Sequence, residues 1–312
     1  MNSIEVLAPG LLTTVQDLGR EGHGPEGVSA SGAADPVALQ LGNLLLDNPP
    51  GTAALEMTLV GGTFVFPAGA AIALTGSDFG AELNQQPVEL WKTCALPSGA
   101  KLSLGPTRDG ARCYLCIAGG ISVEPFLGSA STHLLSGLGG FHGRALRKGD
   151  ILPIGPHAAE RPQRKLPSRA LYELQPKKTL RATDGPQADF FPEEVRRLFY
   201  NSAFRVTEEA DRLGLRLEGP ALANTMGEMI TEGVSLGAVQ ITPSGQPIIL
   251  FVEQQTTGGY PKIANIIGAD LYCVGQLRPR DSIRFERVSL QYARSLWIAQ
   301  QRWLASGAKL FT

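Results

Sequence analysis

The sequence predicts a mainly β protein with two barrel or sandwich domains and a few peripheral helices. Three observations support this fold class. Glycine and proline are abundant, at 37 and 22 of 312 residues, and the apolar runs are short and β-rich. Several motifs also occur twice, 131 to 139 residues apart. Short apolar runs separated by turn residues are typical of closed or packed all-β folds rather than of alternating βαβ units.

The apolar runs predict strands, and two amphipathic segments predict helices. Asp35 is placed to cap a helix over residues 36–46, with Pro36 at its first position. Ser289 is placed to cap a second helix over residues 290–305, whose apolar residues repeat at helical spacing. The clearest predicted strands cover residues 62–66, 71–75, 113–117, 238–242 and 247–252.

A distant internal duplication indicates two related domains. The repeated motifs are Leu-Thr or Val-Thr followed by Asp and Gly (74–83 and 206–217), Gly-Gly after an apolar strand (119–120 and 258–259), and Leu-Arg before an Asp-containing turn (146–151 and 277–283). A charged, proline-rich stretch separates the two copies. We therefore predict an N-terminal domain over residues 1–155, a linker over 156–180 and a C-terminal domain with a terminal helix over 181–312.

Composition excludes several classes of protein. A net charge of −1 gives no electrostatic case for nucleic acid or a membrane surface. No apolar run approaches the roughly 20 residues of a membrane helix, and residues 1–12 do not resemble a signal peptide. Cys113 and Cys116 lie three apart in a predicted strand and so point to opposite faces, which argues against a zinc or redox pair. The expected compartment is the cytosol.

The segment 253–265 is the strongest candidate for a functional site. It follows the apolar run 247–252, which predicts a buried strand. Hydrogen-bond donors and glycine backbone are therefore placed together at the end of that strand. Gln240 begins a strand leading toward it. The alternative to a functional site is a hairpin turn that carries polar side chains without binding a ligand. The candidate residues are Gln255, Thr256, Thr257, Gly258, Gly259, Tyr260 and Lys262.

Three further segments contain candidate side chains. Residues 13–20 hold Thr14, Gln16 and Arg20, where an Asp17–Arg20 pair is either a turn ion pair or part of a ligand site. Arg144 follows a glycine-rich stretch suited to an anion or to a tight barrel closure. Glu56 stands within an apolar run. It is therefore either one partner of a buried structural pair or a general acid or base.

Motifs for nucleotide and biotin chemistry are missing from the sequence. Residues 22–27 fit G-x-G-x-x-G, but Pro25 and Glu26 interrupt it and a loop follows. The sequence has no phosphate loop, no H-E-x-x-H, no G-x-S-x-G and no biotin-attachment Met-Lys-Met. The four histidines show no metal-ligand spacing. An activity that needs ATP or biotin would therefore need partner chains.

Taken together and in order, the motifs resemble the biotin-dependent carboxyltransferase-like family, also called allophanate-hydrolase subunit 2. The resemblance covers nearly the whole chain, and length and motifs are most similar to the C subunits of bacterial ATP-dependent 5-oxoprolinases. The motifs are Thr13-Thr14-Val15-Gln16-Asp17-x-Gly19-Arg20, Ser31-Gly32-Ala33-x-Asp35, Leu55-Glu56-x-Thr58, Ala118-Gly119-Gly120, Leu127-Gly128-Ser129-x-Ser131-Thr132, Gly139-Gly140-Phe141-x-Gly143-Arg144, Asp211-Arg212-x-Gly214-x-Arg216-Leu217 and 255–264.

The resemblance implies two tandem cyclophilin-like β-barrel domains with a cleft between them. It implies action with oxoprolinase subunits A and B, most directly B, on a lactam, with ATP used by the complex, no biotin attached to this chain and any metal unknown. Two alternatives remain: a regulatory protein like the antagonist of the sporulation-kinase inhibitor, and a biotin-dependent carboxyltransferase acting on urea or a similar amide. The sequence departs from the family pattern at Glu253-Gln254, where Asp-Arg is usual, and at Ala130, where arginine is usual.

The resemblance also suggests roles for the candidate residues. Lys262, Thr257 and the backbone of Gly258 and Gly259 would supply donors to an oxyanion, while Gln240 and Tyr260 would orient the substrate. Glu56 or Asp35 would act as the base. Further substrate contacts are expected from Thr256, Thr14, Gln16, Arg20 and Arg144.

Overall fold

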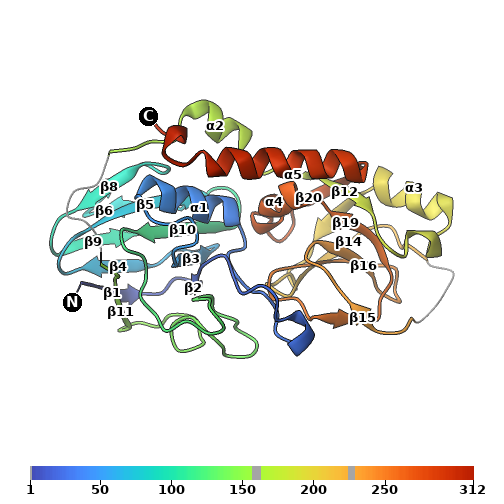
Figure 1. The fold of residues 1–312 in the computed structure, drawn as a ribbon, viewed down its shortest axis with the longest axis horizontal. Coiled ribbons are helices and arrows are strands. Elements are labelled where there is room, and N and C mark those ends of the chain that lie inside the picture. The colour runs from blue at the N-terminus through green and yellow to red at the C-terminus, as the bar shows by residue number, and fades with distance from the viewer. Residues whose placement is uncertain (1, 157–162, 224–228) are drawn as a thin grey trace. The chain divides into compact units, whose positions relative to one another are not determined.

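A computed structural model describes residues 2–156, 163–223 and 229–312. They form two compact units. Unit 1 comprises Met1–Arg20, Ser31–Gln175 and Trp303–Thr312, and unit 2 comprises Glu21–Ala30 and Pro176–Arg302. The main passage from unit 1 to unit 2 thus falls inside the predicted linker, of which residues 157–162 lie outside the described residues. The predicted mainly β class is confirmed (Figure 1).

Unit 1 is built from two antiparallel sheets. The six-stranded sheet has the order β11 (Ile151–Pro153), β1 (Ser3–Ala8), β4 (Thr63–Phe66), β9 (Ala100–Ser103), β6 (Glu82–Leu83) and β7 (Gln86–Pro87). The five-stranded sheet has the order β2 (Leu12–Gln16), β3 (Ala54–Thr58), β10 (Arg112–Ile117), β5 (Ala70–Gly76) and β8 (Thr93–Leu96). The strands predicted at 62–66, 71–75 and 113–117 are confirmed as β4, β5 and β10.

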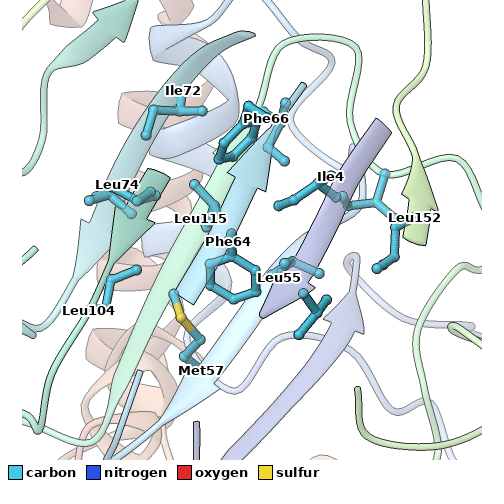
Figure 2. Close-up of a cluster of buried hydrophobic side chains, with 14 of the residues drawn as sticks. Ile4, Leu55, Met57, Phe64, Phe66, Ile72, Leu74, Leu104, Leu115 and Leu152 are labelled. Carbon is cyan, nitrogen blue, oxygen red and sulfur yellow. The ribbon is translucent and has the colours of Figure 1, made fainter. Parts of the chain in front are cut away.

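The main core of unit 1 contains apolar side chains from both sheets. Figure 2 shows Phe64 and Phe66 of β4 gathered with Leu55 of β3 and Leu115 of β10. These four side chains are fully buried. Successive residues of a strand point to opposite faces, so one face of each sheet contributes to this core.

The other face of the five-stranded sheet is covered by helix α1 (Pro36–Leu45). Asp35 caps the helix as predicted, because its Oδ1 accepts from the Ala38 N–H at 2.9 Å. Gly42 lets the helix approach β10 closely, since a Cβ there would lie 2.5 Å from Cys116 Sγ. Cys116 packs in this second cluster and Cys113 in the main core, which confirms that the two thiols point to opposite faces.

Unit 2 is a closed barrel of seven strands among the residues described. A parallel pair of β12 and β20 closes it, and the other pairs are antiparallel. The strands predicted at 238–242 and 247–252 are confirmed within it. In barrel order the strands are β12 (Thr179–Asp184), β19 (Lys262–Ile266), β16 (Ala238–Ile241), β17 (Pro247–Leu250), β14 (Gly214–Glu218), β13 (Ala203–Val206) and β20 (Ser282–Arg287).

The helices of unit 2 are peripheral. Helix α3 (Glu193–Asn201) packs on β20, where Phe199 stacks on Phe285 with ring centroids 4.4 Å apart. Helix α5 (Leu290–Ala305) begins as predicted, because the Ser289 hydroxyl accepts from the Tyr292 N–H. None of the helices in the described ranges combines the length and apolarity that crossing a membrane requires. Unit 2 also contains α4 (Leu271–Gly275), η1 (Gly24–Glu26), η2 (Ala188–Phe190) and η3 (Gly268–Asp270), whereas α2 (Ser168–Glu173) and η4 (Gly307–Leu310) belong to unit 1.

The duplicated motifs form matching turns in the two units. The Asp150 carboxylate accepts from the Arg147 N–H at 2.7 Å, and the Asp281 carboxylate accepts from the Arg278 N–H at 2.8 Å. The two Gly-Gly pairs differ, because Gly119 and Gly120 have φ of 83° and 72°, whereas the pair at 258–259 is not left-handed. The repeated Asp turns therefore share their geometry, and the repeated Gly-Gly pairs do not.

Candidate functional site

Two long polar side chains lie together on neighbouring barrel strands of unit 2. Gln240 of β16 is paired in register with Lys262 of β19, at an irregularity in the ladder. Directly opposed residues of antiparallel strands share a face of the sheet. Both side chains are buried, each residue being 2% exposed. The barrel therefore holds an ammonium group and an amide side by side, where an apolar pair would be expected.

The Lys262 ammonium group is bound by a carboxylate. Its Nζ lies 2.5 Å from Glu232 Oε1, and the Gln187 amide donates to the same oxygen at 2.8 Å. Gln187 is itself anchored on β19, because its Oε1 accepts from the Lys262 N–H at 3.2 Å. The hydrogen bond from Lys262, followed by that from Gln187, lowers the pKa of Glu232 from its usual value. An ion pair from Lys262 and a hydrogen bond from Gln187 thus converge on a single carboxylate oxygen.

Glu232 is supplied by a small ribbon separate from the barrel. The ribbon consists of β15 (Glu232–Gly233) and β18 (Thr257–Gly258). Glu232 pairs with Gly258, Gly233 pairs with Thr257, and the Val234 N–H donates to the Thr256 carbonyl at 3.1 Å. The predicted segment therefore forms one strand of the ribbon and then continues into β19, which carries Lys262.

Gly258 lets the ribbon approach the end of the Gln240 side chain closely. A Cβ at Gly258 would lie 2.6 Å from Gln240 Nε2, which is shorter than real Cβ contacts allow. At Gly259 a Cβ would meet its nearest atoms, Met229 O and Thr231 Oγ1, at an ordinary 3.5 Å. The two adjacent glycines therefore differ in their packing.

Replacing Gly258 with alanine is expected to lower the free energy of unfolding of unit 2 by about 1–2 kcal/mol, because the buried Gln240 amide must move within a packed barrel. The matched variant Gly259→Ala is expected to cost under about 0.5 kcal/mol. Urea denaturation of both variants measures the difference. Equal stability of the two variants would show that Gly258 does not constrain Gln240.

The rest of the predicted segment is more exposed. Thr257 and Gln255 are exposed, and the Tyr260 residue is 42% exposed. The Tyr260 carbonyl is 3.5 Å from Gln240 Nε2. The structure thus buries Gln240, Gly258 and Lys262, while Thr257 and Tyr260 are exposed at the surface.

Sequence reasoning missed Glu232 and Gln187. Lys262 and Glu232 are 30 residues apart, and Gln187 lies in a turn after β12, in a Gly-Pro-Gln sequence that reads as an ordinary turn. The one available signal was the short Glu-Gly run before Gln240, which by itself predicts only a turn. Glu253, at the departure from the family pattern, forms a buried ion pair with Arg212.

Glu56 lies in a buried network of unit 1. Its Oε2 accepts from the Tyr114 hydroxyl at 2.6 Å and from the Ala34 N–H at 2.8 Å, and Arg112 Nε lies 3.9 Å from its Oε1. The Tyr114 oxygen in turn accepts from the Asp35 N–H at 2.7 Å. Burial, followed by the charge of Glu56, raises the pKa of Tyr114 well above its usual value.

These contacts give both predicted bases a structural role. Glu56 holds the chain at Ala34 and Asp35 against the sheet, and the Asp35 side chain caps α1. Both are almost completely buried. Their action as general bases stays a prediction.

The motif at residues 13–20 forms a second buried cluster in unit 1. Gln16 donates to Thr14 Oγ1 at 3.0 Å and to the Thr132 carbonyl at 3.1 Å. Asp17 accepts from the hydroxyls of Ser129 and Ser131, each at 2.6 Å. The motifs 13–20 and 127–132 are thus joined to each other by hydrogen bonds.

Arg20 binds backbone oxygens within the same unit. Its guanidinium group donates to the carbonyl of Phe126 at 3.3 Å and to that of Ser131. It also lies over the Phe126 ring, with Cζ 5.6 Å from the centroid. These contacts of Arg20 stabilise the loop that follows Phe126.

Arg144 forms a two-pronged ion pair with Asp150. The two guanidinium nitrogens donate to the two carboxylate oxygens at 2.7 and 2.9 Å. The hydrogen bond from Arg144 is the main cause that lowers the pKa of Asp150 below its usual 3.8. This geometry closes a turn of unit 1.

The Asp150 pair predicts a pH-dependent contribution to stability. Because the folded-state pKa is lowered, the stabilisation is present above the unfolded-state pKa of about 3.8 and is lost as the pH falls through the folded-state value. Arg144→Met is expected to lower the free energy of unfolding by about 1–2 kcal/mol near pH 6, and the difference from wild type should shrink as the pH falls below 3.8.

Denaturation at several pH values measures this difference. Arg147→Met is the matched control, because Asp150 accepts from the Arg147 backbone N–H and the Arg147 side chain is exposed. A difference between Arg144→Met and wild type that stays constant with pH would contradict the assignment.

A groove of about 890 Å³ lies on unit 2 away from the predicted residues, none of which lines it. Its three arginines each face a glutamate: Arg205 with Glu218, Arg216 with Glu209, and Arg280 with Glu208. The paired charges give the groove no excess of either sign. Within the ranges that the structure covers, no cluster of three or more His, Cys, Asp and Glu side chains is placed to hold a metal ion.

Comparison with known proteins confirms the family suggested by the motifs. Residues 26–287 match the family described as "Carboxyltransferase domain, subdomain A and B". The chain is 38% identical to the 5-oxoprolinase C subunit of Escherichia coli over 96% of both chains, and 35% identical to its namesake in Haemophilus influenzae over 94% of both. The crystal structure of K. lactis urea amidolyase matches 97% of this chain at 33% identity and a TM-score of 0.91, over 20% of that longer chain. The protein therefore belongs to the carboxyltransferase domain family, subdomains A and B.

Proposed function

We propose that this protein is a subunit of an ATP-dependent 5-oxoprolinase, which hydrolyses the lactam 5-oxo-L-proline to L-glutamate. The support is that two relatives named as the C subunit of 5-oxoprolinase match it at 38% and 35% identity, each over at least 94% of both chains. In this proposal the chain acts with subunits A and B, most directly with B, in the cytoplasm.

The observation that best supports a catalytic role is the convergence of donors at Lys262. Lys262 Nζ and Gln187 Nε2 both contact Glu232 Oε1, at 2.5 and 2.8 Å. Attack of water on a lactam carbonyl places negative charge on one oxygen, and preorganised donors in a dry site stabilise such charge strongly. Lys262 is 2% exposed, so its charge acts with little screening by water.

The neighbouring residues would bind and orient the substrate. The Gln240 amide is adjacent to Lys262, and the backbone at Gly258 and Gly259 carries no side chain that would block approach. Thr256, Thr257 and Tyr260 would contact the substrate from the ribbon side. In this arrangement the ligand enters where Glu232 now lies.

ATP would be used at the level of the complex. A lactam is a resonance-stabilised amide, and transfer of the γ-phosphoryl group of ATP to its oxygen would release ADP and make the carbonyl carbon a better electrophile. Addition of water with cleavage of the ring C–N bond would give an acyl phosphate and the free amine. A second water would hydrolyse the acyl phosphate through an oxyanion and release phosphate and glutamate. The sequence contains no phosphate loop, so we assign nucleotide binding to a partner subunit. This chain would contribute the charged and amide donors around the reacting oxygen.

A second candidate function is carboxyl transfer to urea or a similar amide, with biotin carried on another chain. The observation that favours it is the match to K. lactis urea amidolyase, at a TM-score of 0.91 over 97% of this chain. Urea is also a small amide, and its developing charge could be stabilised by the same donors.

The two functions are separated by measuring products. Two samples are incubated with 5-oxo-L-proline and ATP, and the glutamate released is measured. One sample is the chain alone, and the other is the chain mixed with the products of neighbouring genes. Glutamate release in the mixture, with little from the chain alone, is the expected result. Biotin-dependent incorporation of bicarbonate into urea would favour the second function. Tight association with a neighbouring gene product without turnover of either amide would instead indicate a regulatory protein.

A further inference from the structure

The ion pair between Lys262 and Glu232 is unequally buried. The lysine side chain is 3% exposed and the glutamate side chain is 42% exposed. A buried ammonium group without an anion is strongly destabilised, so Lys262 requires a negatively charged neighbour. A carboxylate that is partly in water can be rehydrated at much lower cost. The anion can therefore be exchanged from the solvent side while the lysine stays in place.

Strand β15, which carries Glu232, is only two residues long and lies outside the barrel. It forms a two-stranded sheet apart from the barrel, with pairs Glu232–Gly258 and Gly233–Thr257. Among the described residues, no heavy atom lies within 4 Å of a Cβ placed at Gly233, so that part of the structure leaves the strand open on this side. Short segments with few packed contacts open at low free-energy cost. Glu232 can therefore leave Lys262 without unfolding the barrel.

The chemistry of the cluster fits a monoanion. Lys262 is the charged group that acts on Glu232, and Gln187 adds a neutral donor to the same carboxylate oxygen. Gln240 adds a second amide beside the lysine. One positive charge with amide donors suits a small molecule that carries one carboxylate and an amide, whereas phosphate groups are usually bound by more cationic sites.

We propose that Glu232 is an internal competitor that occupies the position of a ligand carboxylate on Lys262 in the isolated chain, before assembly of the complex brings the reacting lactam oxygen to that ammonium group. The ligand must displace the Glu232 carboxylate and then takes over its contacts with Lys262 and Gln187. Glu232 thereby keeps the buried lysine neutralised in the empty site and lowers the affinity for ligand. This inference rests on the proposed function for the identity of the ligand, 5-oxo-L-proline.

Calorimetric titration of the full chain tests the competition. Glu232→Gln keeps the size of the side chain and removes its charge, so 5-oxo-L-proline is expected to bind about tenfold more tightly than to wild type, since a competing state that is about 90% populated weakens apparent binding by that factor. The lactam 2-pyrrolidinone, which lacks the carboxylate, should bind to Glu232→Gln no more tightly than to wild type. Adding Lys262→Met to Glu232→Gln should abolish the gain for 5-oxo-L-proline.

Glu209→Gln is the matched control. Glu209 is an exposed glutamate of unit 2 whose ion pair with Arg216 spans 3.5 Å, and its replacement should leave binding unchanged. Equal or weaker binding of both 5-oxo-L-proline and acetate to Glu232→Gln, in a protein that circular dichroism shows to be folded, would overturn the proposal.

A measurement on the wild-type chain keeps the proposal testable if Glu232→Gln does not fold. The Glu232 carboxyl resonance is followed by NMR against pH, with and without 5-oxo-L-proline. Lys262 is the main cause that lowers the pKa of Glu232. Displacement by the ligand should therefore return this pKa upward toward 4.5. A pKa unchanged at saturating ligand would contradict displacement.

Failure of this inference can be distinguished from failure of the proposed function. If the complex releases glutamate but Glu232→Gln binds no more tightly, the function stands and the competition is wrong. If acetate binds more tightly to Glu232→Gln while 5-oxo-L-proline does not bind to any form, the competition stands and the substrate is wrong.

Discussion

Replacing Lys262 with methionine is expected to lower glutamate release by the assembled complex about 100-fold or more. Loss of one preorganised donor to an oxyanion typically costs about 2.7–4 kcal/mol of transition-state stabilisation. Methionine keeps the buried apolar stem and removes the ammonium group. Steady-state rates with 5-oxo-L-proline and ATP measure the effect, together with the melting temperature of the variant.

Stability is expected to change little in this variant, because Glu232 is 42% exposed at its side chain and can be hydrated once the lysine is gone. Lys178→Met is the matched control in the same unit. Lys178 forms an ion pair with Asp281, but its side chain is 46% exposed, so its loss should leave turnover within about twofold. Wild-type turnover in Lys262→Met would remove Lys262 from the reaction.

Replacing Glu56 with alanine is expected to lower the free energy of unfolding of unit 1 by about 3–5 kcal/mol. The change leaves the Tyr114 hydroxyl and the Ala34 N–H without their acceptor in a buried site, and it leaves Arg112 without the carboxylate 3.9 Å away. Urea denaturation, followed by probes specific to each unit, measures the loss.

Two variants test the origin of that loss. Tyr114→Phe removes two hydrogen bonds of the network, the one to Glu56 and the one from the Asp35 N–H, and should cost about 1–3 kcal/mol. Glu82→Ala, at an exposed glutamate of β6 in the same unit, should cost under about 0.5 kcal/mol. If Glu56→Ala is nearly as stable as wild type and yet inactive in the complex, Glu56 acts as the base and not as a structural acceptor.

Local sequence patterns were sufficient to predict much of the architecture. The caps of α1 and α5, the strands β4, β5, β10, β16 and β17, and the opposite orientation of Cys113 and Cys116 all follow from interactions within a few residues or from strand alternation. The segment containing Gly258 and Lys262 was also predictable, because its residue types are unusual after a buried strand.

The partners of the predicted side chains depended on tertiary structure. Gln187 and Glu232 are 45 residues apart, and Glu56 and Tyr114 are 58 residues apart. Arg144 was predicted to contact a ligand, but its observed partner is Asp150, six residues along the chain in a turn. The sequence does not reveal whether a carboxylate, an amide or a guanidinium group binds a ligand or another side chain.

The amino-acid sequence alone determined that the chain is mainly β, that it belongs to a recognisable family, and that polar residues follow the strand before residue 253. Tertiary structure alone decided that Lys262 is buried and that its charge is balanced by Glu232. The physical reason is that strand and cap preferences are set by neighbouring residues, whereas the burial of a charge depends on strands that come together only when the barrel closes.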